Sequence, residues 1–264
     1  MRVLFVGDVV GKAGRQILKR GLAKLQSQME LDLVVANVEN AAAGFGITPD
    51  IADKFFDGGI DVLTSGNHIW DKKDILGYLV REPRLLRPMN YPPSCPGAGS
   101  YVAHARNGVP VAVLNLQGRV FMPIIDCPFQ AADREVPRLK KEARVVLVDM
   151  HGEATSEKAA MGWYLDGKVA AVLGTHTHIP TADERVLPGG TAFITDVGMC
   201  GSFDSVIGIE RKSSFPRFLS AIPTRFEVAK ANPWLNAVVI DIDEQKGLAR
   251  SIERLRFLES DLEG

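Results

Sequence analysis

The chain is poor in cysteine and has no long apolar run. Cys95, Cys127 and Cys200 lie far apart, and no CxxC pair occurs. We therefore expect neither a zinc knuckle nor a disulfide framework, but reduced thiols in a cytoplasmic protein. No apolar run approaches the roughly 20 residues that span a bilayer. The first residues, MRVLFVGD, read as a strand without a signal core, so no membrane partner is expected.

The chain also lacks an excess of charge of either sign. Lys and Arg total 31 and Asp and Glu total 32, which gives a formal charge of −1 over 264 residues. This balance argues against a broad basic face, and therefore against duplex nucleic acid as a partner. It leaves small phosphate esters open as ligands, because a metal ion can bind them locally. An apolar content of 46% is ordinary for a globular protein, and we expect one domain over residues 1–264.

Apolar runs alternate with helical patterns through most of the chain. The first strands are expected within residues 2–8, 31–38 and 60–66, and the first helices within 11–29, 48–56 and 71–80. This order predicts a largely parallel sheet covered by helices. Thr48 is expected to cap the second helix, with Pro49 as its first residue.

A proline-rich connector over residues 81–99 precedes a hairpin around the Asn107-Gly108 turn. A second set of alternating helices and strands follows, and the last third reads as strand-rich and antiparallel. We therefore expect an α/β fold with two packed mixed β-sheets flanked by helices, a four-layer αββα sandwich.

The most informative residues lie where expected strands end. Four of the five histidines share this position: His68, His151, His176 and His178. Asp8 and Glu39 occupy the same position after two earlier strands. Because strand ends in an open α/β sheet converge on one edge, these side chains predict a transition-metal site there. The fifth histidine, His104, lies in the hairpin and fits an ordinary surface role.

Each of these residues has a plainer interpretation when taken alone. Asn67 and His68 in SGNH fit a simple turn, Glu39 beside Asn40 fits a solvated loop, and Asp8 fits a helix cap. The pair in GTHTHIP fits hydrogen-bonded groups, although extended chain would place His176 and His178 on the same side. The metal site is favoured because residues of these types follow each of the expected strands.

Two other motifs fail on spacing. GDVVGKAG has three residues rather than four between Gly7 and Gly11, and Ala13 replaces the Ser or Thr of a P-loop. The same segment lacks the GxG of a dinucleotide-binding loop. Lys12 and Arg15 on the following helix fit a solvated face, with phosphate contact as the alternative. Asp149 could either orient His151 or cap its strand.

The order Asp8, Glu39-Asn40, GNH, His151 and GTHTH resembles the calcineurin-like metallophosphoesterases. The segments FVGDVVG, VANVENAAAGFGIT, TSGNHIWD, VDMHGEATSEK and GTHTHIPTADE resemble the YmdB-like bacterial cyclic-nucleotide phosphodiesterases over nearly the whole chain. Val10 replaces the histidine of the wider superfamily's DxH motif, and Glu39-Asn40 replaces its GDxxD motif. The YmdB-like branch shares these departures.

The resemblance implies two metal ions bridged by Glu39, with His68 as general acid. The other implied ligands are Asp8, Asn40 and His178 for one ion, and Asn67, His151 and His176 for the second. Imidazole and carboxylate ligands without thiolate suit iron or manganese, with zinc as a further candidate. Because asparagine is neutral, two divalent ions leave the centre positive enough to attract a phosphodiester.

The implied reaction opens a 2′,3′-cyclic nucleotide to the 3′-nucleotide. A metal-bridging hydroxide attacks phosphorus, and His68 protonates the departing alkoxide. A phosphomonoesterase or nucleotidase with the same metals is an alternative, and so is a metal-binding regulatory protein on a phosphoesterase scaffold. The native metal, the physiological substrate and a homo-oligomeric state are left open.

Overall fold

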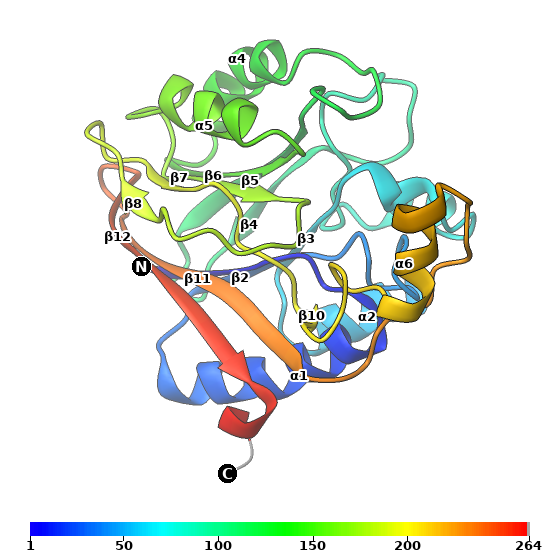
Figure 1. Cartoon of the computed structure of the whole chain (residues 1–264). Coiled ribbons are helices and arrows are strands. Elements are labelled where there is room, and N and C mark those ends of the chain that lie inside the picture. The colour runs from blue at the N-terminus through cyan, green and yellow to red at the C-terminus, as the bar shows by residue number, and fades with distance from the viewer. Residues whose placement is uncertain (263–264) are drawn as a thin grey trace.

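The computed structural model describes residues 1–262 and contains two six-stranded sheets (Figure 1). The first sheet comprises β1 (Arg2–Val6), β2 (Leu33–Asn37), β3 (Val62–Thr64), β10 (Gly201–Ser202), β11 (Pro233–Asp243) and β12 (Leu248–Leu258). The second comprises β4 (Ser100–His104), β5 (Pro110–Gln117), β6 (Val145–His151), β7 (Ala171–Thr175), β8 (Arg185–Val186) and β9 (Ala192–Ile194). The strand orders are β10-β11-β1-β2-β3, with β12 beside β11, and β4-β5-β6-β7-β9-β8.

All helices but the last cover the outer faces of the two sheets. The helices are α1 (Gly11–Gln28), α2 (Pro49–Asp57), α3 (Ile75–Arg81), α4 (Pro128–Leu139), α5 (Thr155–Tyr164) and α6 (Arg211–Ser220), with 3-10 turns η1 (Asn67–Trp70) and η2 (Glu259–Leu262). Helices α1 and α2 belong to the apolar cluster of the first sheet, whereas α4 and α5 belong to that of the second. Among residues 1–262, no helix has the length and apolarity needed to cross a membrane.

The inner strands are apolar on both faces because each face is covered. Val3 and Phe5 of β1 pack in the cluster between the sheets with Leu147 of β6. Leu4 and Val6 point the other way, into the cluster that includes α1. Near-continuous apolar runs of this kind are typical of buried parallel strands. The four-layer α/β sandwich predicted from the sequence is therefore confirmed.

One sequence-based expectation is wrong, one helix was not predicted, and the predicted helix cap is met in position only. Strand β9 pairs with β7 in parallel, although the last third was expected to be antiparallel. Helix α6 was not predicted; Pro216 lies inside it, and its apolar residues are mostly exposed. Thr48 occupies the N-cap position of α2, but its side chain makes no capping hydrogen bond.

Candidate metal centre

The strand ends of both sheets bring the predicted residues to one edge of the molecule. From the first sheet, Asp8 follows β1, Glu39 and Asn40 follow β2, and Asn67 and His68 begin η1 after β3. From the second sheet, His151 ends β6, and His176 and His178 follow β7. A pocket of about 440 Å³ opens here, and its lining includes Glu39, Asn40, His68, His176 and His178. His104 ends β4 with an exposed side chain, as expected.

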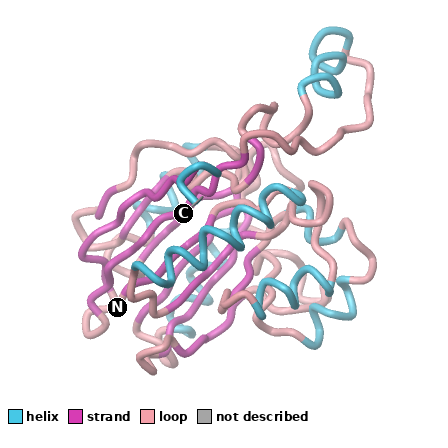
Figure 2. The backbone as a smooth tube through the Cα atoms, turned by 90° about the horizontal axis from the view of Figure 1, so that it is seen from below, coloured by secondary structure: helices cyan, strands magenta, loops and turns pink. Residues whose placement is uncertain are grey.

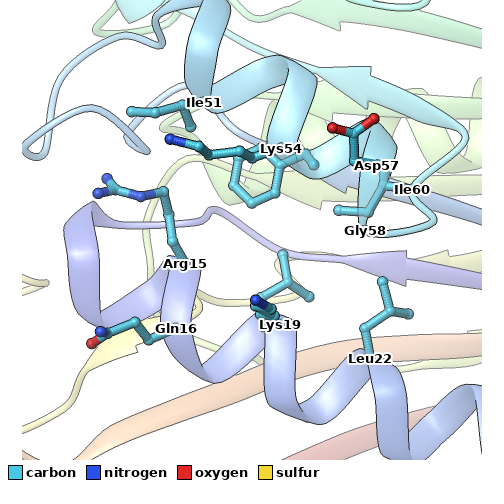
Figure 3. Close-up of a pocket in the computed structure, with 11 residues that line it drawn as sticks. Arg15, Gln16, Lys19, Leu22, Ile51, Lys54, Asp57, Gly58 and Ile60 are labelled. Carbon is cyan, nitrogen blue, oxygen red and sulfur yellow. The ribbon is translucent and has the colours of Figure 1, made fainter.

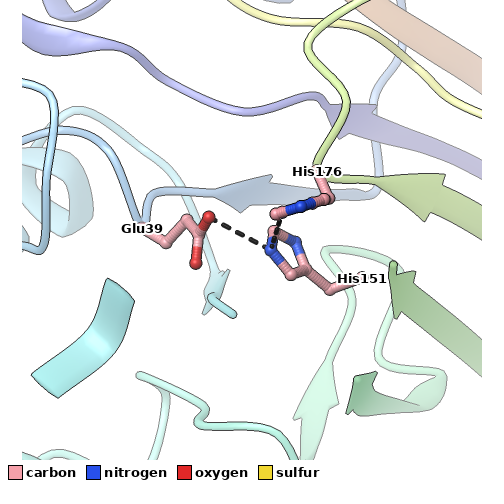
Figure 4. Close-up of side chains that lie close together, drawn as sticks. All are labelled: Glu39, His151 and His176. Carbon is pink, nitrogen blue, oxygen red and sulfur yellow. Dashed lines mark hydrogen bonds and ion pairs between the residues drawn. The ribbon is translucent and has the colours of Figure 1, made fainter. Parts of the chain in front are cut away.

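The centre of this edge is a cluster of Glu39, His151 and His176 (Figure 4). His151 Nε2 lies 3.1 Å from Glu39 Oε1 and 3.0 Å from His176 Nδ1. Glu39 and His151 are almost completely buried. One ligand atom from each of the three residues lies within 4.8 Å of the others, which suits a single cation. Asp8 is also close, because its Oδ2 accepts the backbone N–H of His176 at 3.2 Å.

Burial and mutual charge shift the pKa values of this cluster. Burial raises the pKa of Asp8 to about 6, against the lowering effect of His178 and His151. For Glu39, burial acts upward, but His151 and His68 bring its pKa down to about 2. For His151, burial acts downward, but Glu39 and the other carboxylates bring its pKa up to about 9. Burial and the neighbouring His151 lower the pKa of His176 to about 3. The pocket therefore favours one positive charge, on His151 beside Glu39, and disfavours a second one on His176.

His178 and Asn40 face each other through two acceptor atoms. His178 Nδ1 lies 2.8 Å from the carbonyl oxygen of Ile207 and can only donate to it, so Nε2 of the neutral ring carries a lone pair. That Nε2 lies 3.3 Å from Asn40 Oδ1. The Asn40 amide is fixed in this orientation because its Nδ2 donates to the Gly44 carbonyl at 2.9 Å. Two converging lone pairs without a proton between them suit a cation.

Two further oxygens fit the same interpretation. Asp8 Oδ1 and Asn67 Oδ1 are buried and have no hydrogen-bond partner. A buried oxygen without a partner is costly unless a cation or water satisfies it. Asn67 follows Gly66, where a Cβ atom would lie only 2.1 Å from His151 Nε2 and 2.5 Å from Glu39 Oε2. Gly66 thus lets the backbone that carries Asn67 approach the cluster.

The expectation of extended chain from residue 176 to residue 178 is wrong. Strand β7 ends at Thr175, and His176 and His178 have positive φ angles of 102° and 67°. A buried ion pair holds this turn, since Lys158 Nζ lies 2.7 Å from Asp196 Oδ2. The same oxygen accepts the Thr177 N–H at 3.1 Å and the Thr177 hydroxyl at 2.8 Å. Both histidines still line the pocket, but a tertiary contact rather than strand alternation directs them there.

Asp149 is linked to His151 through the hydroxyl of Thr175. Thr175 Oγ1 donates to Asp149 Oδ1 at 2.7 Å and lies 2.9 Å from His151 Nδ1, so it accepts that N–H. Asp149 Oδ2 accepts the Thr64 hydroxyl at 2.5 Å and Asn37 Nδ2 at 3.0 Å. The network leaves His151 Nε2 free to face Glu39. None of these supporting residues, Thr175, Thr64 and Asn37, was predicted from the sequence, although a polar residue within a buried apolar strand is a usable signal.

His68 lies at the exposed side of the cluster. Its backbone N–H donates to Glu39 Oε2 at 3.0 Å, and its Nδ1 lies 2.8 Å from Asp71 Oδ2. The Phe45 ring packs edge-on against its imidazole, with 5.1 Å between ring centroids. Asp71, which the sequence analysis did not single out, therefore fixes the ring and leaves Nε2 available. Val10, where the wider superfamily has histidine, also lines the pocket.

A second hollow of about 450 Å³ lies between α1 and α2 (Figure 3). Leu22 and Ile60 form part of its apolar surface, and Lys19 and Lys54 lie at its edge. None of the predicted metal ligands lines it. Arg15, also in its lining, donates to the Ala41 carbonyl. This contact agrees with a structural role for Arg15 rather than phosphate binding.

Comparisons with known proteins agree over nearly the whole chain. A family model described as "YmdB-like protein" matches residues 4–255. A 2′,3′-cyclic-nucleotide 2′-phosphodiesterase from Bacillus subtilis is 47% identical over 255 residues, which cover 97% of this chain and 96% of that protein.

Two solved structures are also similar. The crystal structure of a hypothetical protein from Thermus thermophilus has a TM-score of 0.92 and 39% identity, covering 98% of this chain and 100% of that one. The crystal structure of a phosphatase from Mycoplasma pneumoniae has a TM-score of 0.91 and 36% identity, covering 98% and 93%.

Proposed function

The chain belongs to the YmdB-like family of metallophosphoesterases and is a phosphodiesterase, and we propose that it opens 2′,3′-cyclic nucleotides to 3′-nucleotides with two transition-metal ions. The observation that carries this proposal is the convergence of nitrogen and oxygen atoms able to bind a metal at the joint edge of the two sheets. His178 Nε2 faces Asn40 Oδ1, and His151 Nε2 faces Glu39 Oε1. The apolar cluster that the two sheets share supports a single domain.

The ligand division implied by the sequence resemblance suits these contacts. Asn40 and His178 would hold one ion together with Asp8, whose Oδ1 is buried without a partner. His151 and His176 would hold the other ion with Asn67. Glu39 would bridge the two, since it lies next to Asn40 in the chain and contacts His151. When bound, such ions supply a water nucleophile at neutral pH and neutralise the phosphoryl oxygens; iron or manganese suits these ligands, and zinc is the alternative.

The protein groups around the pocket then bind the substrate and move a proton. Hydrolysis adds one water to phosphorus, breaks the P–O2′ bond and leaves the 3′-phosphate. The departing O2′ needs a proton, and His68 Nε2 would donate it, while Asp71 holds Nδ1. The pocket of about 440 Å³ has the size of a small-ligand site. Its apolar wall, Ile207, Ile209 and Phe226, would contact the nucleoside.

The test combines metal analysis with a substrate comparison. Protein purified without added metal should contain two ions per chain and should release 3′-AMP, not 2′-AMP, from 2′,3′-cyclic AMP. Glu39→Gln should lose metal and slow hydrolysis by about 100-fold or more, because the bridging carboxylate is gone. Glu30→Gln is the matched control, since Glu30 is exposed just beyond α1. Fewer than two ions, or faster hydrolysis of 3′-AMP than of the cyclic diester, would contradict the proposal.

A further inference from the structure

One segment of the chain stands away from the two sheets. Figure 2 shows a helix carried outward on two long loops, and its place in Figure 1 identifies it as α6. We call residues 204–230 the arm. Although its tip is remote, its base belongs to the metal pocket, because Ile207, Ile209 and Phe226 line that pocket. The Ile207 carbonyl also accepts the Nδ1–H of His178. The arm and the predicted metal centre therefore share a wall.

A basic groove runs along the base of the arm. It has a volume of about 720 Å³ and shares Phe226 with the metal pocket, so the two hollows adjoin. Its charged lining consists of Lys12, Lys212, Arg225 and Lys230 on the basic side and Glu210 and Glu227 on the acidic side. Four positive and two negative groups make the groove net positive, in a chain whose total charge is −1. The even charge of the whole sequence conceals this local excess.

The positive side chains of the groove are free to meet a ligand. Within residues 1–262, none of the four forms an ion pair with a carboxylate, and all four are exposed. The groove has one aromatic side chain in its lining, Phe226, and further aromatic side chains are exposed on the arm. The Arg217 guanidinium lies 5.1 Å from the centroid of the Phe226 ring, and Phe215 and Phe218 on α6 are 52% and 76% exposed. Basic grooves with aromatic faces are typical of sites for single-stranded nucleic acid.

The chemistry of the substrate explains why such a groove would adjoin this pocket. A 2′,3′-cyclic phosphate forms when a ribose 2′-hydroxyl attacks its own 3′-phosphodiester and expels the next nucleotide. The product therefore sits at the 3′ end of an RNA chain, and its 5′ oxygen is free to carry further nucleotides. Each of those nucleotides adds one negative phosphate and one base. A free mononucleotide would leave a groove of about 720 Å³ beyond Phe226 unused.

We propose that the groove binds the nucleotides 5′ to the cyclic phosphate, so that the preferred substrate is a short single-stranded RNA with a 2′,3′-cyclic end. This inference rests on the proposed phosphodiesterase function. Lys212 and Arg225 contact the backbone phosphates, and Phe226, between the two hollows, stacks on a base. The metal pocket itself handles only the terminal nucleotide.

The test compares a mononucleotide with an oligonucleotide on the same enzyme. The substrates are 2′,3′-cyclic AMP and a single-stranded RNA hexamer ending in a 2′,3′-cyclic phosphate. For Lys212→Ala/Arg225→Ala, kcat/KM on the hexamer should fall about tenfold more than kcat/KM on the mononucleotide. The salt dependence of log KM on the hexamer should also become shallower by about 1.4, or roughly 0.7 for each lost phosphate contact. Lys140→Ala/Lys141→Ala, an exposed pair after α4, controls for charge alone.

Each remaining outcome decides the inference. Equal effects on both substrates, or no effect on the hexamer, would overturn it. A change in sedimentation with equal effects on both substrates would instead make the arm a contact between copies of the chain, which also overturns it. If the wild-type enzyme does not cleave 2′,3′-cyclic AMP, the proposed function fails separately. Fluorescence anisotropy with a hexamer ending in a 3′-phosphate then tests the groove: about tenfold weaker binding by the double variant supports it, and equal binding refutes it.

Discussion

Replacing Thr175 with valine should weaken both the fold and the metal centre. Valine keeps the shape of the side chain but removes the hydroxyl that links His151 Nδ1 to Asp149 Oδ1. All three residues are completely buried, so water cannot replace the lost partner. Because an unsatisfied buried group costs about 1–3 kcal/mol, two such groups should lower the free energy of unfolding by about 2–4 kcal/mol. Asp149 keeps its contacts with Thr64 and Asn37. The expected loss is therefore smaller than the sum of two maximal costs of about 3 kcal/mol each.

The same change should also affect metal binding. The Thr175 hydroxyl accepts the Nδ1–H of His151 and so directs Nε2 toward Glu39. Loss of a group that orients a ligand histidine typically costs about 10–100-fold in metal affinity. Urea unfolding of metal-free protein measures the first effect, and metal content after dialysis against a chelator of known affinity measures the second.

Thr191→Val provides the matched control. Thr191 is equally buried, and its hydroxyl donates to the backbone carbonyls of Leu165 and Val169, away from the histidines. The free energy of unfolding of Thr191→Val should fall by about 1–3 kcal/mol, and its metal affinity should stay unchanged. The role of Thr175 in orienting His151 would be refuted if Thr175→Val kept the wild-type metal affinity. It would also be refuted if both variants lost metal affinity equally.

Three further predictions follow from the same contacts. His68→Ala should keep its metal but slow cleavage of the ribose ester more than cleavage of an activated aryl ester; equal losses would argue against proton donation. Lys158→Met leaves Asp196 buried and unpaired, and should lower the free energy of unfolding by about 3–5 kcal/mol in urea, whereas a loss below about 1 kcal/mol would contradict a structural role for this pair. In metal-free protein, carboxylates raise the pKa of His151 from 6.5 to about 9. The protonated His151 ring therefore stabilises the folded protein fully below pH 6.5, and this stabilisation is lost as the pH rises to about 9. The free energy of unfolding should therefore fall over this range by on the order of 1–3 kcal/mol, and a flat profile would exclude the shift.

Much of the fold and of the candidate site could be predicted from the sequence by itself. Apolar runs of about five residues, alternating with helical patterns, determine the parallel αβ order, since each buried strand needs helices or a second sheet on both faces. Parallel strands in turn bring their carboxyl ends to one edge. Asp8, Glu39, Asn67 and His151 could therefore be placed together from their positions after strands, without any knowledge of their contacts.

Only the tertiary structure decided how these side chains are aimed. The strand-like run before His176 and the proline after Ile179 predicted extended chain at His176 and His178, but the Lys158–Asp196 pair stabilises a turn with positive φ there. The contacts of His178 with Asn40 and of His151 with Glu39 join the ends of strands in different sheets, more than 100 residues apart in the chain. The arm was missed for a related reason, since helix α6 is mostly exposed and carries too little apolar periodicity to predict. The spacing of apolar residues within one segment predicts which of its faces is buried. The direction of a side chain at the site depends instead on contacts that form only when the two sheets pack.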